Sequence, residues 1–279
     1  MLWLLLAAGL SFGFGQLFKW SQRRRCHAPT VVSTNYLVMA VVLAAWHFWS
    51  GNDFAAPASI TVGASMGLAF IVAMLIMTAA LERAPVAMVL TSFRLAILVP
   101  IVVSVWIWGE TLSLIQAAGI GLALVALTLI TSSRASTATG PVGPKALGLG
   151  LVVFGTQAVG QVCLRWVHYA GLDEQRLTVL MTCAATAGGL GALFVLLQRY
   201  RPRAKDLRMG IGIGLFNMVC LATILFALSQ LDGTIFFPVS GCLIVVMDAA
   251  FAHFWWQEKL SRVGVSGAVL GALAMLLVM

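Results

Sequence analysis

Residues 107–130 read IWGETLSLIQAAGIGLALVALTLI, a short polar turn followed by an apolar run that carries glycines. The apolar run has the length of a membrane-spanning helix, which needs about 20 mostly apolar residues. A related stretch, FWWQEKLSRVGVSGAVLGALAMLLVM, occupies residues 254–279. The two stretches keep one spacing of 148 residues at two pairs of positions, Trp108 with Trp256 and Gly119 with Gly267. The chain therefore carries the same kind of hairpin twice, once near its middle and once at its end.

The composition assigns the chain to a class of protein. Charged residues make up 9% of its 279 residues, whereas a soluble domain averages about 25%. This scarcity excludes a water-soluble enzyme domain and a disordered tail. The net charge of +8 does not call for nucleic acid, because membrane proteins concentrate Lys and Arg in cytoplasmic loops. The sequence predicts an all-α membrane protein that crosses the bilayer many times.

Apolar runs long enough to cross a bilayer occur ten times along the chain. The first run has no basic residue before it and no small-residue cleavage site after it, so we interpret it as a retained span and not a secretory signal. The predicted spans cover residues 1–19, 30–50, 58–80, 84–108, 112–132, 145–168, 176–198, 207–229, 234–256 and 261–279.

The spans divide into two halves of five. Residues 134–144 form a linker rich in Ser, Thr, Gly and Pro, with residues 1–133 before it and residues 145–279 after it. Because five is an odd number, the second half enters the membrane from the opposite side. The sequence thus predicts two inverted-topology repeats of five helices, which is an architecture of secondary transporters.

The basic residues predict the orientation. Loops after the odd-numbered spans hold fourteen Lys and Arg, whereas loops after the even-numbered spans hold only Arg165 and Arg176. Positive residues remain in the cytoplasm, so both termini are expected outside an inner or plasma membrane.

The paired hairpins at residues 107–130 and 254–279 resemble those of the drug/metabolite transporter superfamily, EamA type. The resemblance covers essentially the whole chain. It implies ten helices in two five-helix repeats, a carrier for a small organic solute that is often exported, and a cavity between the halves walled by spans one, three, four, six, eight and nine. Family members usually have cytoplasmic termini, which differs from the charge count.

Two charged residues lie well inside predicted spans, Arg94 in span four and Asp248 in span nine. A charge inside the bilayer costs about 2.5–3.5 kcal/mol on insertion scales, so such residues are commonly functional. The helical rise places both at similar depth from the same side, in the corresponding spans of the two repeats. We expect Arg94 and Asp248 to pair or to face a substrate cavity together. A structural ion pair that only locks the halves together remains an equal alternative.

Neutral polar side chains within or near the spans form a second group of candidate substrate-binding residues. They can hydrogen-bond a solute, although polar groups in spans also hold neighbouring helices together. The residues are Gln16, Asn35, Tyr36, Gln157, Gln161 and Asn217.

Two prolines lie inside the spans that carry the charges, Pro100 in span four and Pro238 in span nine. Proline removes one backbone hydrogen bond and kinks a helix. Both are candidate hinges for alternating access, and a fixed bend is the alternative interpretation.

The favoured function is a secondary transporter that moves a metabolite, amino acid or drug-like solute by alternating access. Its expected partners are the lipid bilayer and the solute, with no nucleic acid and with a homodimer left open. A channel or a non-transporting membrane scaffold is the alternative. We expect no enzymatic activity, no catalytic residues, no cofactor and no metal site, because no HExxH, no GxSxG and no pair of carboxylates within spans occurs.

Overall fold

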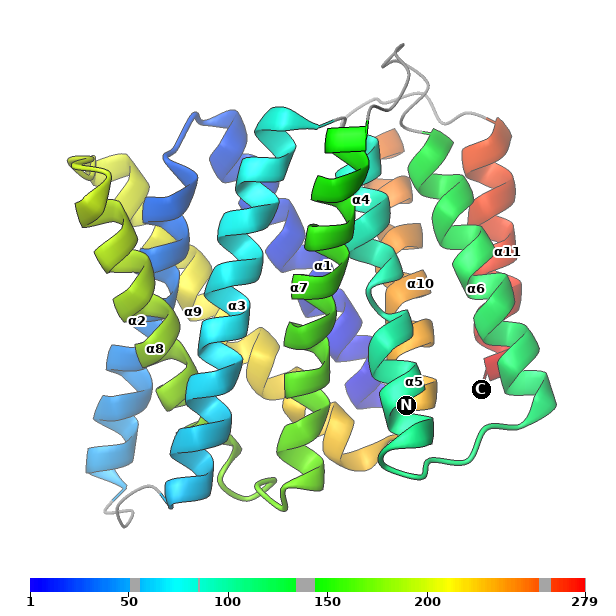
Figure 1. The fold of residues 1–279 in the computed structure, drawn as a ribbon, viewed down its shortest axis with the longest axis horizontal. Helices are drawn as coiled ribbons and strands as arrows, with labels where there is room; N and C mark the ends of the chain where they lie inside the picture. Colours follow the sequence, from blue (N-terminus) through cyan, green and yellow to red (C-terminus); the bar gives the residue numbers. More distant parts are fainter. Residues whose placement is uncertain (51–55, 85, 134–143, 256–261, 279) are drawn as a thin grey trace. The chain divides into compact units, whose positions relative to one another are not determined.

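Apolar helices make up the described part of the chain. The computed structural model describes residues 1–50, 56–84, 86–133, 144–255 and 262–278 (Figure 1). Within these residues the structure has eleven α-helices and no strand, which confirms the all-helical prediction. The helices are α1 (Leu2–Arg23), α2 (Ala28–Trp49), α3 (Pro57–Arg83), α4 (Val86–Leu95), α5 (Leu98–Trp106), α6 (Leu114–Ser133), α7 (Pro144–Tyr169), α8 (Arg176–Leu197), α9 (Ala204–Gln230), α10 (Gly233–Phe254) and α11 (Arg262–Val278).

The helices coincide with the ten predicted spans, except that span four is divided into α4 and α5. Six helices are long and apolar enough to cross a membrane: α1, α2, α3, α7, α8 and α9. Shorter apolar helices fall in the other four predicted spans. Large apolar side chains on the outside are extensively exposed, as with Trp49 at 90% and Leu114 at 90%. These features support an integral multi-pass membrane protein, in which helices satisfy their own backbone hydrogen bonds.

The helices form two compact units, and each unit takes residues from both halves of the sequence. The first unit contains Met1–Leu75 and Cys163–Gln230, and the second contains Ile76–Val162 and Leu231–Met279. The boundaries fall inside α3 and α7, so each of these helices contributes to both units. The units therefore differ from the sequence halves 1–133 and 145–279, and the predicted linker at 134–144 lies almost wholly outside the described residues.

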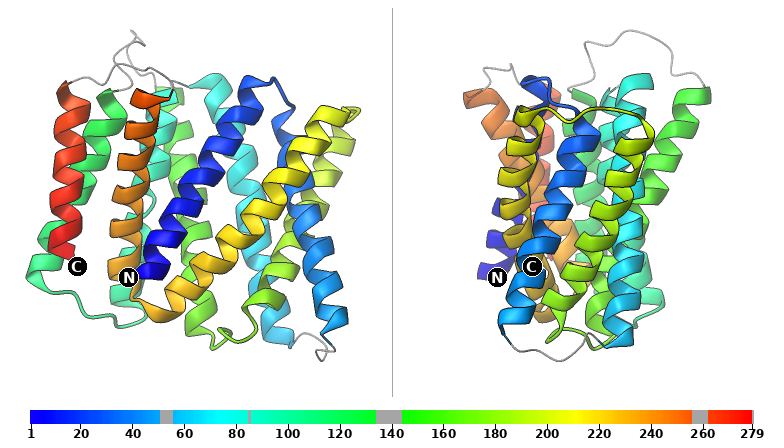
Figure 2. Two further views of the ribbon diagram at one scale, coloured as in Figure 1. Left: turned by 180° about the vertical axis from the view of Figure 1, so that it is seen from behind. Right: turned by 90° about the vertical axis from the view of Figure 1, so that its left-hand side faces the viewer.

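Glycines allow the helices of the first unit to approach one another closely. Figure 2 shows α2 in blue, α8 in yellow-green and α9 in yellow. A Cβ at Gly188 or Gly191 of α8 would meet Leu37 or Ser33 of α2. On α9, a Cβ at Gly210 would meet Thr34 of α2. Small residues are the usual means by which membrane helices pack. The glycine series that opens α9 is thus a packing surface for α2.

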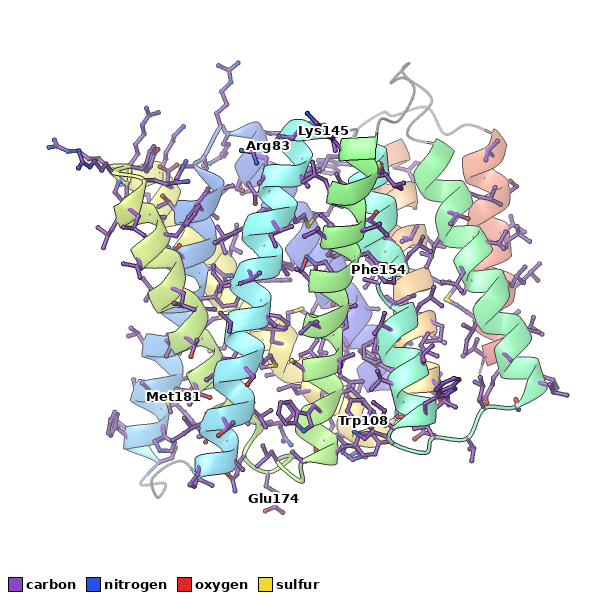
Figure 3. The ribbon with its side chains drawn as sticks, in the orientation of Figure 1. Arg83, Trp108, Lys145, Phe154, Glu174 and Met181 are labelled. Carbon is purple, nitrogen blue, oxygen red and sulfur yellow. The ribbon has the colours of Figure 1, made fainter. Side chains whose placement is uncertain are left out.

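The second unit packs α11 against α6 and α10. Ala123, Cys242 and Ala274 form a buried cluster where these three helices meet. Arg83 and Lys145 lie at one end of this unit and Trp108 at the opposite end (Figure 3). These two basic residues therefore lie at the same end of the second unit.

Candidate functional site

An ion pair joins α4 to α10 in the second unit. The Arg94 Nη2 donates a hydrogen bond to the Asp248 Oδ2 over 2.8 Å. The structure thus shows the pairing that the matched depths of the two residues predicted. Their side chains are 23% and 18% exposed, so the pair is largely shielded but not fully buried.

The break between α4 and α5 positions Arg94. Pro100 has no N–H to donate to the carbonyl of Ala96, four residues earlier, and its ring excludes a regular helix there. The helix is interrupted at Ala96 and Ile97, and the Ala96 carbonyl accepts a hydrogen bond from the Val99 N–H over 3.3 Å instead. Arg94 therefore lies in the last turn of α4, where the negative end of the helix dipole favours a cation.

Helix α10 remains continuous past its own proline. Pro238 is the sixth residue of α10, so it removes one intrahelical hydrogen bond, the one to the Thr234 carbonyl, without interrupting the helix. Farther along, a Cβ at Gly241 would lie 3.2 Å from Ile97 Cδ1. Gly241, which lies about two helical turns before Asp248, therefore leaves room for Ile97 in the interruption between α4 and α5.

The pair presents two opposite charges of different geometry. The Arg94 guanidinium carries donors in a planar fork that matches a carboxylate or a phosphate. The Asp248 carboxylate accepts hydrogen bonds and matches an ammonium group. A solute with one anionic and one cationic group can bind both side chains, and the pair stays electrically balanced before and after binding.

The neutral candidates divide between the two units. Gln157 and Gln161, on α7, belong to the same unit as the ion pair, and both are partly exposed. The Gln157 Nε2 lies 3.9 Å from the Met77 Sδ, which is a weak hydrogen bond. Their role in binding a solute stays a prediction.

Gln16, Asn35, Tyr36 and Asn217 belong to the first unit. The Asn217 Nδ2 donates to the Asn35 Oδ1 over 3.3 Å, and these residues are 4% and 1% exposed. Tyr36 is 5% exposed, and Gln16 is partly exposed. The asparagine pair connects α2 to α9 and accounts for two of these polar groups by helix packing.

Arg165 is a functional candidate that the sequence analysis placed in a loop. It lies inside α7 and is 1% exposed. Its guanidinium donates to the Leu228 carbonyl and, over 3.4 Å, to the Tyr169 hydroxyl, and it lies 4.9 Å from the Tyr169 ring centroid. The sequence analysis counted it with the loops, although residue 165 falls within the predicted span 145–168, and that position was the signal by which it could have been found.

Glu110 has a defined task in the repeated hairpin motif. The residue is 8% exposed. Its carboxylate accepts a hydrogen bond from the backbone N–H of Thr234 over 2.9 Å. Thr234 lies in the first turn of α10, where an anion is favoured by the helix dipole. The corresponding residue of the second motif, Glu258, lies outside the described residues.

Metal-ligand geometry does not appear in the described part of the chain. Among those residues, no group of three or more His, Cys, Asp or Glu side chains is arranged to hold a metal ion. The chemistry that this candidate site offers is charge recognition and hydrogen bonding.

Comparisons with known proteins agree with this architecture. Residues 1–132 match the EamA-like transporter family, which confirms the resemblance for the part of the chain that contains the first hairpin. One solved crystal structure of a protein shares the fold with a TM-score of 0.79 and 14% identity, over 98% of this chain and 97% of its own. No curated protein matches the sequence.

Proposed function

Because residues 1–132 match the EamA-like transporter family, we propose that the protein is a secondary transporter of a small organic solute. The family match supports a membrane transporter of the drug/metabolite type. The solute, its site and the transport mechanism are our proposal, and one observation carries them: the partly exposed ion pair between Arg94 and Asp248.

The proposed site exchanges one ion pair for two. In the empty state Arg94 and Asp248 neutralise each other, which avoids the cost of an unpaired charge within the membrane. A zwitterionic solute, such as an amino acid, presents a carboxylate to Arg94 and an ammonium group to Asp248. The site is neutral with and without the solute, so neither state has to carry a net charge through the low-dielectric part of the membrane.

The proposed movement is alternating access by two inverted five-helix repeats. Arg94 and Asp248 occupy the fourth span of each half, and this correspondence supports the repeat. The interruption at Ala96 and Ile97 is the proposed hinge, because hinge residues absorb backbone changes at the ends of helices. Gln157 and Gln161 are proposed as further hydrogen-bonding groups for the solute. We propose no enzymatic step.

The proposed orientation follows the basic loops. It places the connections after α1, α3, α6, α8 and α10 in the cytoplasm and both termini outside an inner or plasma membrane. The bilayer and the solute are the proposed partners, and a homodimer stays open.

Counterflow in proteoliposomes tests the transporter. Purified protein is first screened by thermal shift against amino acids, sugars, nucleotides and lipophilic cations, and a stabilising solute is then labelled. We expect saturable counterflow that falls at least 10-fold in Arg94→Gln and in Asp248→Asn. Arg83→Gln and Asp173→Asn, which change charges near helix ends, serve as matched controls and should retain activity.

Two results would overturn parts of this proposal. Conductance far above carrier rates would identify a channel. Full counterflow activity in both Arg94→Gln and Asp248→Asn, with normal insertion, would leave the ion pair as a structural connection and remove it from the solute site.

A further inference from the structure

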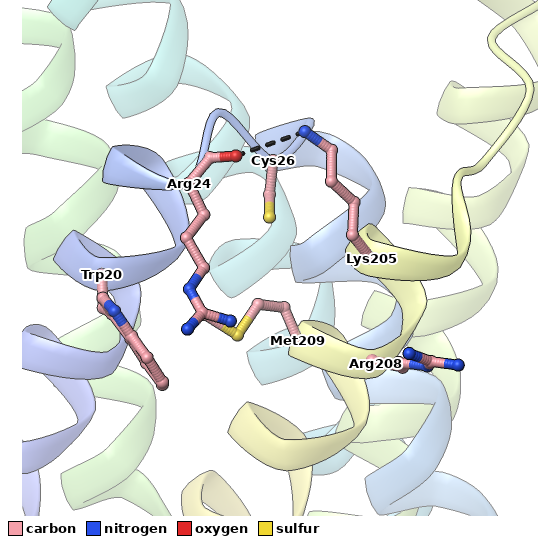
Figure 4. A pocket seen from close by; sticks show the side chains of 6 residues that line it. All are labelled: Trp20, Arg24, Cys26, Lys205, Arg208 and Met209. Carbon is pink, nitrogen blue, oxygen red and sulfur yellow. Dashed lines mark hydrogen bonds between the residues drawn. The ribbon is translucent and has the colours of Figure 1, made fainter.

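A hollow lies in the first unit, where the end of α1 meets the start of α9. It has a volume of about 320 Å³ and is lined by Trp20, Arg24, Cys26, Lys205, Arg208 and Met209 (Figure 4). This volume is at the lower limit of small-molecule sites, which span about 300–1,000 Å³. Three of the six lining residues are cations, and they come from two helices far apart in the sequence.

A network of hydrogen bonds fixes the walls of the hollow. The Lys205 Nζ donates to the Arg24 carbonyl over 3.2 Å and to the Arg25 carbonyl over 2.8 Å. The Arg24 guanidinium lies 4.0 Å from the centroid of the Trp20 ring, which holds it against an apolar face. These contacts hold two of the cations in place before any ligand arrives.

The neighbouring carboxylate is already committed to other donors. Asp206 is fully buried and accepts the His27 N–H over 3.1 Å, the Arg203 N–H over 3.2 Å and the Tyr200 hydroxyl over 3.0 Å. It is also the only acid in residues 19–27 and 198–209, which together hold nine Lys and Arg. The hollow is therefore strongly positive.

Two arginines occupy backbone positions that normally belong to glycine. Arg25 and Arg199 each have a φ of 53°, whereas Gly171, two residues after the end of α7, has a φ of 68°. Arg25 closes α1 with hydrogen bonds from Arg25 N–H to the Gln22 carbonyl and from Cys26 N–H to the Ser21 carbonyl. A left-handed conformation is unfavourable for a residue with a Cβ, so each of these two turns carries a local cost in backbone energy.

We propose that this hollow binds the phosphate group of an anionic phospholipid. The guanidinium and ammonium groups supply donors for phosphate oxygens, and a phosphate is the anion that Arg recognises best with its planar fork. Trp20 and Met209 supply an apolar wall for the glycerol and the first acyl carbons, as interfacial Trp residues do in membrane proteins. The basic side of the protein faces the leaflet that carries anionic lipids in the orientation proposed above.

Native mass spectrometry of the purified, delipidated full-length protein tests this site with phosphatidylglycerol and phosphatidylcholine. We expect phosphatidylglycerol to bind more tightly. Each cation near a membrane surface contributes about fivefold to anionic-lipid binding, so Arg24→Gln/Arg208→Gln should weaken binding roughly 30-fold. Arg201→Gln/Arg203→Gln removes the same charge from side chains that do not line the hollow, and it should change binding less than threefold.

The same experiment distinguishes a lipid from a soluble phosphate compound. Glycerol phosphate, added without lipid, should bind much more weakly than phosphatidylglycerol, because it lacks the carbons that contact Trp20 and Met209. Equal binding of glycerol phosphate and phosphatidylglycerol would overturn the lipid assignment. Equal losses in the two double variants would show diffuse attraction to basic loops and would overturn the site. Gel filtration and thermal unfolding in a zwitterionic detergent verify that all variants are folded.

Discussion

The Glu110 carboxylate accepts the backbone N–H of Thr234 over 2.9 Å, although the two residues are 124 positions apart. The contact anchors the start of α10 to the hairpin after α5. Glu110→Ala leaves this N–H without its acceptor and removes an anion from the helix N-terminus, so we expect a loss of about 1–2 kcal/mol in unfolding free energy. Thermal unfolding in detergent measures it. Glu174→Ala, at an exposed turn, is the control, and an equal effect there would contradict the assignment.

Removing one partner of the Arg94–Asp248 pair should cost more stability than removing both. A single change, Arg94→Gln or Asp248→Asn, deprives the remaining charge of its 2.8 Å partner in a largely shielded place, for which we expect a loss of about 1–3 kcal/mol. The double variant removes both charges of the pair and should regain at least half of that loss. Denaturation of the four proteins gives the coupling energy. Additive losses would show that the two side chains do not stabilise each other.

Pro100→Ala should restore a hydrogen bond to the Ala96 carbonyl and favour one continuous helix in place of α4 and α5. If the interruption is the hinge, transport should fall at least 10-fold while thermal stability is unchanged or higher. Initial rates of counterflow give the comparison. Pro238→Ala lies in a helix that is already continuous and should change the rate less than twofold. Equal rates in wild type and Pro100→Ala would leave the proline as a fixed bend.

Alanine in place of glycine on α3 should weaken its packing on α8. A Cβ at Gly63 would lie 1.8 Å from Thr182 Oγ1, and one at Gly67 would lie 2.4 Å from the Cys183 carbonyl oxygen. Each substitution should cost about 2–3 kcal/mol through overpacking. At Gly155 no atom would lie within 4 Å of the new Cβ, so Gly155→Ala should stabilise α7 by roughly 0.5–1 kcal/mol. Thermal unfolding of the three variants provides the test.

Cys26 offers a direct test of orientation. It lies between α1 and α2 and is partly exposed, whereas the other four cysteines are buried. A membrane-impermeant maleimide should label it in inverted vesicles and not in intact cells if the basic loops are cytoplasmic, and Cys26→Ser should abolish the label. Labelling in intact cells would reverse the orientation.

The labelling rate at this cysteine should also depend on pH in a defined way. Burial, and next the Asp206 carboxylate, raise the pKa of the Cys26 thiol above its ordinary value of 9.0. Since the thiolate is the reactive form, the rate should continue to increase as pH rises above 9.0. A plateau below that pH would contradict the raised pKa.

The sequence was sufficient for features that depend on composition and spacing. Long apolar runs predicted the helices, because a membrane leaves backbone groups no partner except one another. Matched depth predicted that Arg94 would meet Asp248. Proline chemistry predicted a disturbance in span four and in span nine, but only span four is interrupted, and α10 runs continuously past Pro238.

Other features depend on contacts between distant segments. The sequence placed Asn35 and Asn217 in one group of candidates with Gln157. In the structure the two asparagines belong to the first unit and Gln157 belongs to the second. The sequence counted Arg165 as a loop charge, although the Leu228 carbonyl of α9 and the Tyr169 hydroxyl of its own helix hold it inside the protein. Which partner satisfies a buried polar group is decided by the fold, and spacing along one helix does not specify it.

The placement of the unit boundaries within α3 and α7 constrains how the protein is made. A ribosome that has released only the first five predicted spans has supplied parts of both units and completed neither. At that stage Asn35, Arg94 and Glu110 all await partners that lie beyond residue 200. The early chain thus carries polar groups whose final bonds form only after later helices enter the membrane. Assembly of either unit is therefore a post-insertion event that depends on the last third of the polypeptide.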